Sequence, residues 1–389
     1  MSDRLSIGLA LSGGGSRAIA FHLGCMRALH DRGVLGRVSI ISAVSGGSVI
    51  AALYAYYDEP FPEFEARVLK LLRRGLVWGI VRQTLFSIET LAILAAWGTS
   101  GAAAFVGAFI KLLIRLIGIF GVSALFLSRM AEICAAPLPR FASRTTAFER
   151  HLYTLFGEAT VDQVARRGLH LSINATELRT GTAFRFGSKE SGCWRLGRLL
   201  TPPHVARAVA ASAAFPAFLP AFDQTLRFRK NGEEREHRVI ITDGGVYDNL
   251  GITCLLPDRS ADWSTNAHPV DFIIACDAGP GMPTGSDRPY FWGSRMLATI
   301  NTIHRRTHSL SYNLLHRMAR TGELRGFLLP YLGQIDERLP YCPADLIPRS
   351  ATFDYPTNFS PMPQSAIDAL SLRGEQLTRL LLDHHAPAL

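Results

Sequence analysis

Short apolar runs alternate with amphipathic stretches along most of this chain. Residues 5–11 and 38–44 are largely apolar runs bounded by polar or glycine positions, which is typical of buried strands. Between them, residues 17–32 place apolar side chains at helical spacing and end at Gly33. This order of strand, helix and strand predicts a parallel pair of strands with a helix on one face.

The same criteria predict the other regular elements of the chain. We expect strands at residues 169–175, 181–187, 237–242 and 270–276, and helices at residues 203–215, 295–320 and 364–384. Residues 330–363 are rich in proline and predict loops. The alternation of strands and helices indicates the α/β class.

One apolar segment does not follow this alternation. Residues 90–110 carry no charge, Lys111 and Arg115 follow on one helix face, and residues 116–128 are again uncharged. Roughly 20 apolar residues span a bilayer as a helix, but residues 97–101 contain the small residues of a turn. Three interpretations follow: a helical hairpin that inserts into or lies on a membrane, a buried helical cap over a site, or a single spanning helix.

Composition narrows the possible partners. The 389 residues are 48% hydrophobic and 19% charged, with a formal net charge of +9. This charge favours an anionic partner, and the absence of a recognisable nucleic-acid module favours a membrane surface over nucleic acid. The six cysteines form no Cys-x-x-Cys pair, so no zinc site or redox dithiol is predicted. The first six residues lack the apolar core of a secretory signal, so we expect a cytoplasmic protein.

Ser45 is the strongest candidate for chemistry. It follows the apolar run 38–44, precedes Gly46 and Gly47, and is followed by the helical pattern of residues 48–55. A serine at a sharp strand-to-helix turn has its hydroxyl held clear of the backbone, and the helix N-terminus stabilises negative charge there. The sequence therefore predicts a nucleophile, although a serine N-cap of an ordinary loop has the same local pattern.

Gly13, Gly14 and Gly15 end the first strand and open the first helix. Successive backbone N–H groups in such a loop can form an oxyanion hole, with Arg17 adding positive charge at its edge. A dinucleotide-binding loop is the alternative, but it requires an acidic residue at the end of the second strand, where this chain has Ser45.

Asp243 follows the apolar run 239–241 and precedes Gly244 and Gly245. A partly desolvated carboxylate at a strand end can act as a general base, because burial raises its pKa toward neutral pH. An Asp-Gly turn without chemistry has the same pattern. The alanine-rich helix at residues 203–215 ends at Pro216 and permits close packing against a neighbouring backbone.

Together these four pieces resemble the patatin-like phospholipases, which join a glycine-rich loop, a G-x-S-x-G turn, an A-S-x-A-x-P helix and a D-G-G/A aspartate. The resemblance implies a Ser–Asp dyad with Ser45 as nucleophile and Asp243 as proton acceptor. It also implies an oxyanion hole at residues 13–15 supported by Arg17. The sequence departs from the family pattern at two positions, where Ala43 and Ala18 replace usual glycines.

We therefore expect a three-layer α/β/α protein with a mostly parallel central sheet and an apolar helical insertion. The resemblance implies a lipid acyl hydrolase that cleaves carboxylic esters through a seryl-acyl intermediate, without metal or cofactor. The catalytic domain is predicted at residues 5–64 and 145–330, with the apolar insertion at 65–144. Residues 331–389 are predicted to form a loop-rich extension with a final helix.

A lipid substrate and an anionic membrane surface are the expected partners, with membrane contact through residues 76–130; nucleic acid is not expected. The sequence defines no oligomeric state. Two alternatives remain: a catalytically silent lipid-binding scaffold of the same fold, and a Ser-His-Asp esterase. In the second, Asp277 and either His304 or His308 would complete the triad in the usual chain order.

Overall fold

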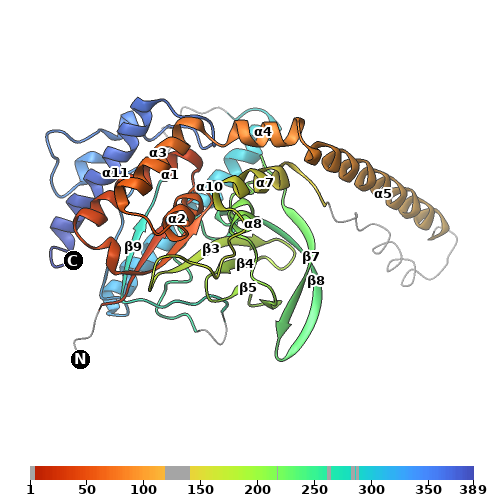
Figure 1. Cartoon of the computed structure of the whole chain (residues 1–389), viewed down its shortest axis with the longest axis horizontal. Coiled ribbons are helices and arrows are strands. Elements are labelled where there is room, and N and C mark those ends of the chain that lie inside the picture. The colour runs from red at the N-terminus through yellow and green to blue at the C-terminus, as the bar shows by residue number, and fades with distance from the viewer. Residues whose placement is uncertain (1–4, 119–140, 217, 261–263, 282–284, 286–288) are drawn as a thin grey trace.

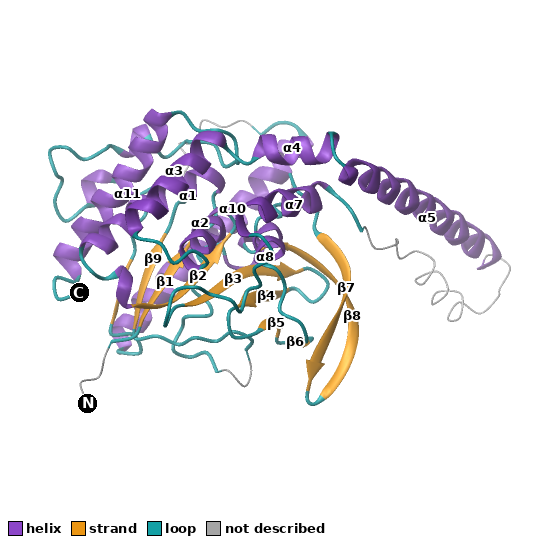
Figure 2. Cartoon of the chain, viewed as in Figure 1, coloured by secondary structure: helices purple, strands orange, loops and turns teal. Residues whose placement is uncertain are grey.

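The computed structural model describes residues 5–118, 141–216, 218–260, 264–281, 285 and 289–389 (Figure 1). Ten strands in these residues form one sheet in the order β10-β9-β1-β2-β3-β4-β5-β6-β7-β8, and β3 also pairs with β8. Figure 2 shows this sheet with helices packed around it.

The predicted strands and helices are present within a few residues of their expected bounds, and several further elements were not predicted. The strands are β1 (Ile7–Leu11), β2 (Val38–Val44), β3 (His170–Glu177), β4 (Thr182–Gly187), β5 (Ser191–Cys193), β6 (Gly197–Leu199), β7 (Phe222–Lys230), β8 (Glu233–Asp243), β9 (Phe272–Cys276) and β10 (Gly326–Leu328). The helices are α1 (Gly15–Asp31), α2 (Gly46–Ala55), α3 (Phe61–Arg74), α4 (Val77–Leu85), α5 (Ile88–Gly118), α7 (Arg144–Phe156), α8 (Val205–Ser212), α9 (Gly245–Asp248), α10 (Trp292–Thr321) and α11 (Gln364–His385).

The α/β class is confirmed, and strands β10, β9, β1, β2 and β3 pair parallel. Successive side chains of a strand point to opposite faces. Leu9 and Leu11 of β1 therefore join the core formed with α1 and α2. Ala10, between them, joins a second core with Leu315 and Met318 of α10.

The prediction of a mostly parallel sheet is wrong for the other half. Strands β3 to β8 pair antiparallel and close on themselves through the β3–β8 pairing. Strands β7 and β8 form a long hairpin at Asn231 and Gly232, which both have positive φ, as a tight hairpin turn requires. Residues 222–230 lack an apolar run because much of β7 is solvent-facing, so periodicity did not reveal this strand.

The predicted turn at residues 97–101 is wrong, because these residues lie inside the long helix α5. The Thr99 hydroxyl donates to the Ala95 carbonyl at 2.9 Å, and the Ser100 hydroxyl donates to the Trp97 carbonyl at 3.2 Å. These polar side chains are thus satisfied within the helix and do not redirect the chain.

Helix α5 is also largely exposed, and it projects away from the rest of the molecule in Figure 1. It contains the one helix in the described residues that is long and apolar enough to cross a membrane, at Ile88–Leu116, and only 17% of its most apolar window is buried. The interpretation as a buried cap is therefore wrong for the described part of the segment. Residues 119–128, the rest of the predicted apolar stretch, lie outside the described residues.

Helix α11 packs directly on α1, so the end of the chain completes the main core. A side chain at Gly24 of α1 would overlap the carbonyl oxygen of Ser371, and one at Gly374 of α11 would overlap that of Phe21. The two helix backbones therefore touch, which only glycine permits.

Gly24→Ala should destabilise the protein by about 1–3 kcal/mol or more, because the added methyl group has no space between α1 and α11. Glycine-to-alanine changes within helices normally stabilise them, so a loss of stability here would indicate steric overlap between the two helices. Urea unfolding followed by circular dichroism measures the change. Gly36→Ala, where an added methyl group meets open space, is the control. Equal unfolding midpoints for the two variants would contradict the packing described here.

Candidate active site

Ser45 lies between β2 and α2 in a strained backbone conformation. Its φ and ψ are 52° and −118°. Residues other than glycine rarely adopt this backbone conformation, which costs them roughly 1–3 kcal/mol. The side chain is 8% exposed. A serine forced into such a turn presents its hydroxyl outward, as in nucleophile turns of serine hydrolases.

The two glycines that follow Ser45 explain how this turn fits. A side chain at Gly46 would overlap the backbone of Gly15, and one at Gly47 would overlap the carbonyl oxygens of Leu11 and Ser12. The serine turn therefore packs against the glycine loop, backbone to backbone. The Ala43 departure from the family pattern is accommodated, because its methyl group is fully buried in the main core.

The glycine loop places open amides beside Ser45. Gly14 and Gly15 have φ of 147° and 59° at the N-terminus of α1, and neither N–H has an acceptor among the described residues. The N–H of Gly13, by contrast, donates to the carbonyl of Asn249 at 3.1 Å. Of the three predicted oxyanion glycines, Gly14 and Gly15 therefore have amides free for a substrate, while Gly13 anchors the loop.

Arg17 supports this loop from inside the protein. Its Nε donates to the carbonyl of Ala278 at 3.0 Å, and its Nη1 donates to that of Tyr355 at 2.8 Å. Burial lowers the pKa of Arg17 to about 10, and the nearby Asp277 partly opposes this effect. The guanidinium thus ties α1 to two distant segments of the chain.

Asp243, the last residue of β8, lies beside Ser45 and is 3% exposed. Its Oδ1 accepts a hydrogen bond from the Gly245 N–H at 2.6 Å. Burial raises the pKa of Asp243 to about 7, although the Gly245 N–H and the nearby Ser45 hydroxyl both act in the opposite direction. The structure therefore brings the predicted pair together, and Asp243 can exchange a proton near neutral pH.

Ser212, at the end of α8, holds both halves of this pair. The Ser45 N–H donates to Ser212 Oγ at 2.9 Å, and the Gly244 N–H donates to the Ser212 carbonyl at 3.2 Å. The alanine-rich pattern of residues 203–215 predicted only close helix packing. The only signal for Ser212 was its place in the A-S-x-A-x-P motif.

The histidine alternative has a different geometry. Asp277 and His308 do meet, with His308 Nδ1 3.0 Å from Asp277 Oδ2. The other ring nitrogen, Nε2, lies 3.0 Å from Asn249 Nδ2 instead of contacting Ser45. Ser45 thus has Asp243, and not a histidine, as its partner.

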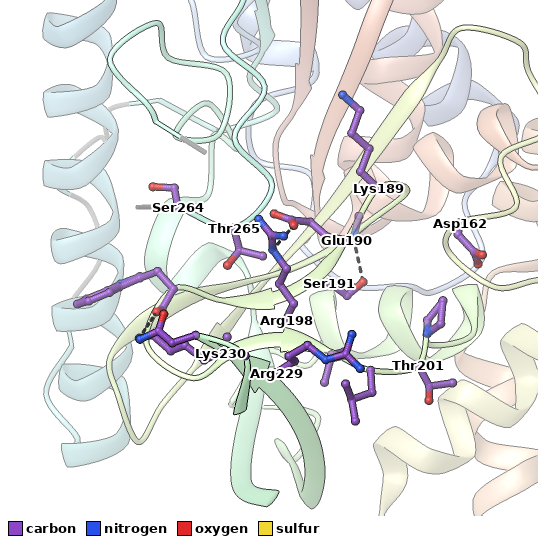
Figure 3. A pocket seen from close by; sticks show the side chains of 18 residues that line it. Asp162, Lys189, Glu190, Ser191, Arg198, Thr201, Arg229, Lys230, Ser264 and Thr265 are labelled. Atoms are coloured by element: carbon purple, nitrogen blue, oxygen red, sulfur yellow. Dashed lines mark hydrogen bonds and ion pairs between the residues drawn. The ribbon is translucent and has the colours of Figure 1, made fainter. Parts of the chain in front are cut away.

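A pocket lies away from the candidate site. It has a volume of about 610 Å³ and lies along β4–β7 (Figure 3). Two of its cations are neutralised: Arg198 pairs with Glu190 at 2.5 Å, and Arg229 pairs with Glu234 at 2.6 Å. Ser45 and Asp243 do not line it, so the position of the candidate chemistry follows from the strained serine and its partners.

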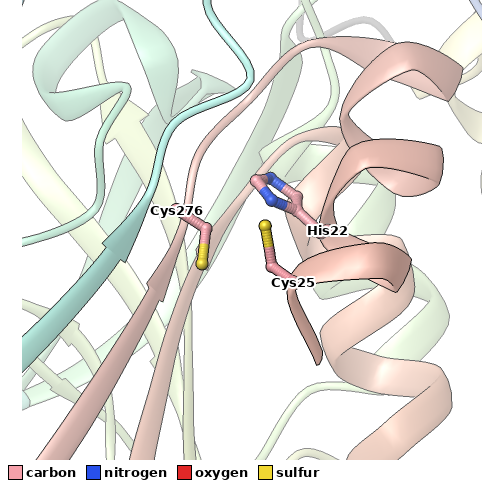
Figure 4. A group of neighbouring side chains, drawn as sticks. All are labelled: His22, Cys25 and Cys276. Atoms are coloured by element: carbon pink, nitrogen blue, oxygen red, sulfur yellow. The ribbon is translucent and has the colours of Figure 1, made fainter. Parts of the chain in front are cut away.

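One group of buried side chains has the composition of a metal site. His22, Cys25 and Cys276 lie with their ligand atoms within 4.8 Å of one another between α1 and β9 (Figure 4). A closed structural zinc site takes four ligands, all deprotonated, and this group offers three. A hydrogen bond with Cys25, together with burial, raises the pKa of the Cys276 thiol well above its usual value. Burial would raise the pKa of the Cys25 thiol as well, but hydrogen bonds with Cys276 and His22 lower it to about 6. With three ligands in place of four, the group does not by itself define a structural metal site.

A strained serine with a carboxylate partner and open amides on an α/β fold is typical of serine hydrolases that transfer acyl groups. The sequence model of the patatin-like phospholipase family matches residues 9–256. The chain belongs to this family, which confirms the resemblance seen in its motifs.

Individual relatives cover the chain unevenly. Over 73 residues the chain is 37% identical to lysophospholipase NTE1 of Pyricularia oryzae, a match that covers 19% of this chain and 5% of that protein. Human GIVD cytosolic phospholipase A2 is 11% identical, with a TM-score of 0.52, over 98% of this chain and 61% of that one. VipD of Legionella pneumophila is 13% identical, with a TM-score of 0.41, over 98% and 67%. The likeness to the human enzyme shows a shared fold.

Asp243→Asn should stabilise the protein at pH 8, by up to about 4 kcal/mol, and leave stability at pH 4 nearly unchanged. The pKa of Asp243 in the folded protein, about 7, lies above the value of an unfolded aspartate, so its ionisation destabilises the fold as pH rises between these values. Thermal unfolding at several pH values measures this difference.

Asp277→Asn is the matched control with the opposite sign. Burial would raise the pKa of Asp277. The charge and hydrogen bond of His308, together with hydrogen bonds from Tyr312 and Gly279, instead lower it to about 2. Its charge therefore stabilises the fold above pH 4, and the asparagine variant should be less stable at pH 8. A loss of stability in Asp243→Asn at pH 8 equal to that of the control would contradict the assignment.

Proposed function

We propose that this protein is a lipid acyl hydrolase that cleaves carboxylic ester bonds with a Ser45–Asp243 dyad. The observation that carries the proposal is the strained Ser45, which lies beside the buried carboxylate of Asp243, whose pKa burial raises to about 7. Membership of the patatin-like phospholipase family supports an ester of a lipid as substrate.

The first half of the reaction transfers the acyl group to the enzyme. Ser45 Oγ attacks the ester carbonyl carbon while its proton passes to Asp243, and the carbonyl oxygen becomes an oxyanion. The free amides of Gly14 and Gly15 donate to this oxygen. When the intermediate collapses, the bond to the alcohol breaks, the alcohol takes the proton from Asp243, and the acyl group stays on Ser45.

The second half releases the acid. Water attacks the seryl ester and gives a proton to Asp243, and a second tetrahedral oxyanion forms at the same amides. Its collapse breaks the bond to Ser45 Oγ, which recovers the proton from Asp243. Only groups of this chain and water take part in these steps.

Ser45→Ala should lower ester hydrolysis by at least about 10⁴-fold, because the nucleophile is lost. Asp243→Asn should lower it comparably, because no base receives the serine proton. For the unaltered protein, kcat/KM should rise with pH through about 7 as Asp243 loses its proton. A chromogenic fatty-acid ester measures the rates, and a fluorophosphonate probe measures labelling of the serine.

Ser294→Ala is the control, since Ser294 is an exposed serine of α10 whose hydroxyl donates to the Phe291 carbonyl at 2.8 Å. It should keep the labelling that Ser45→Ala loses. Unlabelled but folded wild-type protein would favour a catalytically silent lipid-binding scaffold, and full activity of Ser45→Ala would overturn the dyad.

We further propose that α5 attaches the protein to a membrane, and that the other described residues between 76 and 118 take part in this contact. Its side chains are apolar and exposed on several sides, including Trp97 at 71% and Phe105 at 75%, as expected for a helix in contact with lipid. Glu89, at the start of α5, forms an ion pair with Arg150 of α7 at 3.1 Å. This pair fixes the start of α5 to the helices that cover the sheet. A location at the cytoplasmic face and a preference for anionic lipid fit the net charge of +9.

Replacing Leu94, Trp97 and Phe105 together by glutamate should abolish co-sedimentation with phosphatidylglycerol vesicles, because three charges would have to enter the apolar phase. These side chains are exposed, so the fold should be unaffected. Trp194→Glu, an exposed aromatic residue between β5 and β6, is the control. Vesicle binding that survives the triple substitution would contradict the role of α5.

A further inference from the structure

Asp277 is a buried carboxylate that the proposed dyad leaves unused. It directly follows the parallel strand β9, beside the glycine loop, and has no exposed surface. Its Oδ2 accepts hydrogen bonds from the Tyr312 hydroxyl and from His308 Nδ1, and its Oδ1 accepts one from the Gly279 N–H at 2.8 Å. Three donors on one buried carboxylate fix its position and that of the imidazole.

His308, held by Asp277, in turn contacts Asn249. Burial would lower the pKa of His308, but Asp277 raises it. Above this raised pKa the ring is neutral, so that with Nδ1 donating to Asp277, Nε2 is an acceptor and Asn249 Nδ2 donates to it at 3.0 Å. This contact also orients the amide, so that Asn249 Oδ1 turns away from the histidine.

Asn249 Oδ1 lies between the two halves of the candidate site. A side chain at Gly13 would overlap this oxygen and would come within 3.3 Å of Ser45 Cβ. A side chain at Gly245 would come within 2.6 Å of the same oxygen and 2.9 Å of Asp243 Oδ1. The backbone carbonyl of Asn249 accepts the Gly13 N–H as well. One residue thus contacts the glycine loop on one side and the aspartate loop on the other.

We propose that Asp277 and His308 are positioning residues that act through Asn249 to set the spacing between the oxyanion loop and the Asp243 loop. The inference rests on the proposed function, since this spacing matters only if both loops serve one reaction. Neither Asp277 nor His308 touches the reacting atoms. Their effect is on geometry, where a displacement of about 1 Å costs on the order of 100-fold in rate.

The kinetic test compares four variants of the full chain on a chromogenic fatty-acid ester. His308→Ala and Asn249→Ala should each lower kcat by on the order of 100-fold with little change in KM, and the double variant should be no slower than either. His304→Ala, one turn earlier on α10, should behave as wild type. Independent, multiplicative losses in the double variant, or wild-type kcat in either single variant, would overturn the proposal.

Conservative variants separate positioning from folding. In His308→Gln the amide can reach Asn249, whereas in His308→Asn it can reach only Asp277. The glutamine variant should therefore recover more of kcat than the asparagine variant, even where the two have equal melting temperatures. Activities that follow the melting temperatures alone would show a purely structural role and overturn the inference.

A histidine ¹⁵N NMR measurement tests the contact without any hydrolysis. In wild type at high pH, His308 should show the Nδ1–H tautomer, and Asn249→Ala should shift its Nε2 resonance. An Nε2–H tautomer, or a resonance insensitive to Asn249→Ala, would overturn the proposed chain of contacts. If this chain is present but Ser45→Ala keeps full activity, the proposed function fails and the network does not.

Discussion

Contact between two backbones is the constraint on which the candidate site depends. The serine turn and the glycine loop approach so closely that side chains at Gly46 and Gly47 would overlap carbonyl oxygens of Gly15 and Leu11. Because the turn follows β2 and the loop follows β1, two adjacent parallel strands deliver both to one edge of the sheet. The N-termini of α1 and α2 therefore converge on Ser45, where they favour negative charge.

Two buried carboxylates near this edge show how neighbouring groups decide chemistry. Asp243 accepts one hydrogen bond, from the Gly245 N–H, and lies beside the Ser45 hydroxyl, but burial dominates and raises its pKa to about 7. Asp277 is equally buried, but the imidazole of His308 and the phenol of Tyr312 bring its pKa down to about 2. The first can accept and return a proton near neutral pH, while the second stays charged. Residue type and burial are the same, so the difference lies in the partners.

Parts of the chain beyond the family match help to build the site. That match ends at residue 256, yet α10 provides His308 and Tyr312 for Asp277. The segment before α11 also contacts the end of the glycine loop. The Ser16 N–H donates to the Asn358 carbonyl at 2.7 Å, and Arg17 donates to the Tyr355 carbonyl. The division into residues 5–64, 145–330 and 331–389 stays a prediction, but the last of these segments contacts the oxyanion loop directly.

The sequence by itself determined the local structures that carry the candidate chemistry. Apolar runs that end at Leu11, Val44 and Asp243, each followed by glycine or serine, encode a strand and its turn within a few residues, so they could be predicted without knowledge of the fold. The helices at residues 17–32 and 364–384 were likewise encoded by periodicity.

Only the tertiary structure decided which of these pieces meet. Asn249 received no chemical role from the sequence, because its contacts with Gly13 and His308 join segments far apart in the chain and only its contact with Gly245 is local. The antiparallel closure of β3 to β8 was hidden for the same reason: strand pairing is a long-range choice, and β7 is half solvent-facing. The chain order of Asp277 and His308 fitted a catalytic triad, but the fold turns the imidazole toward Asn249 and leaves Ser45 to Asp243, because proximity in space and not order in sequence determines hydrogen-bond partners.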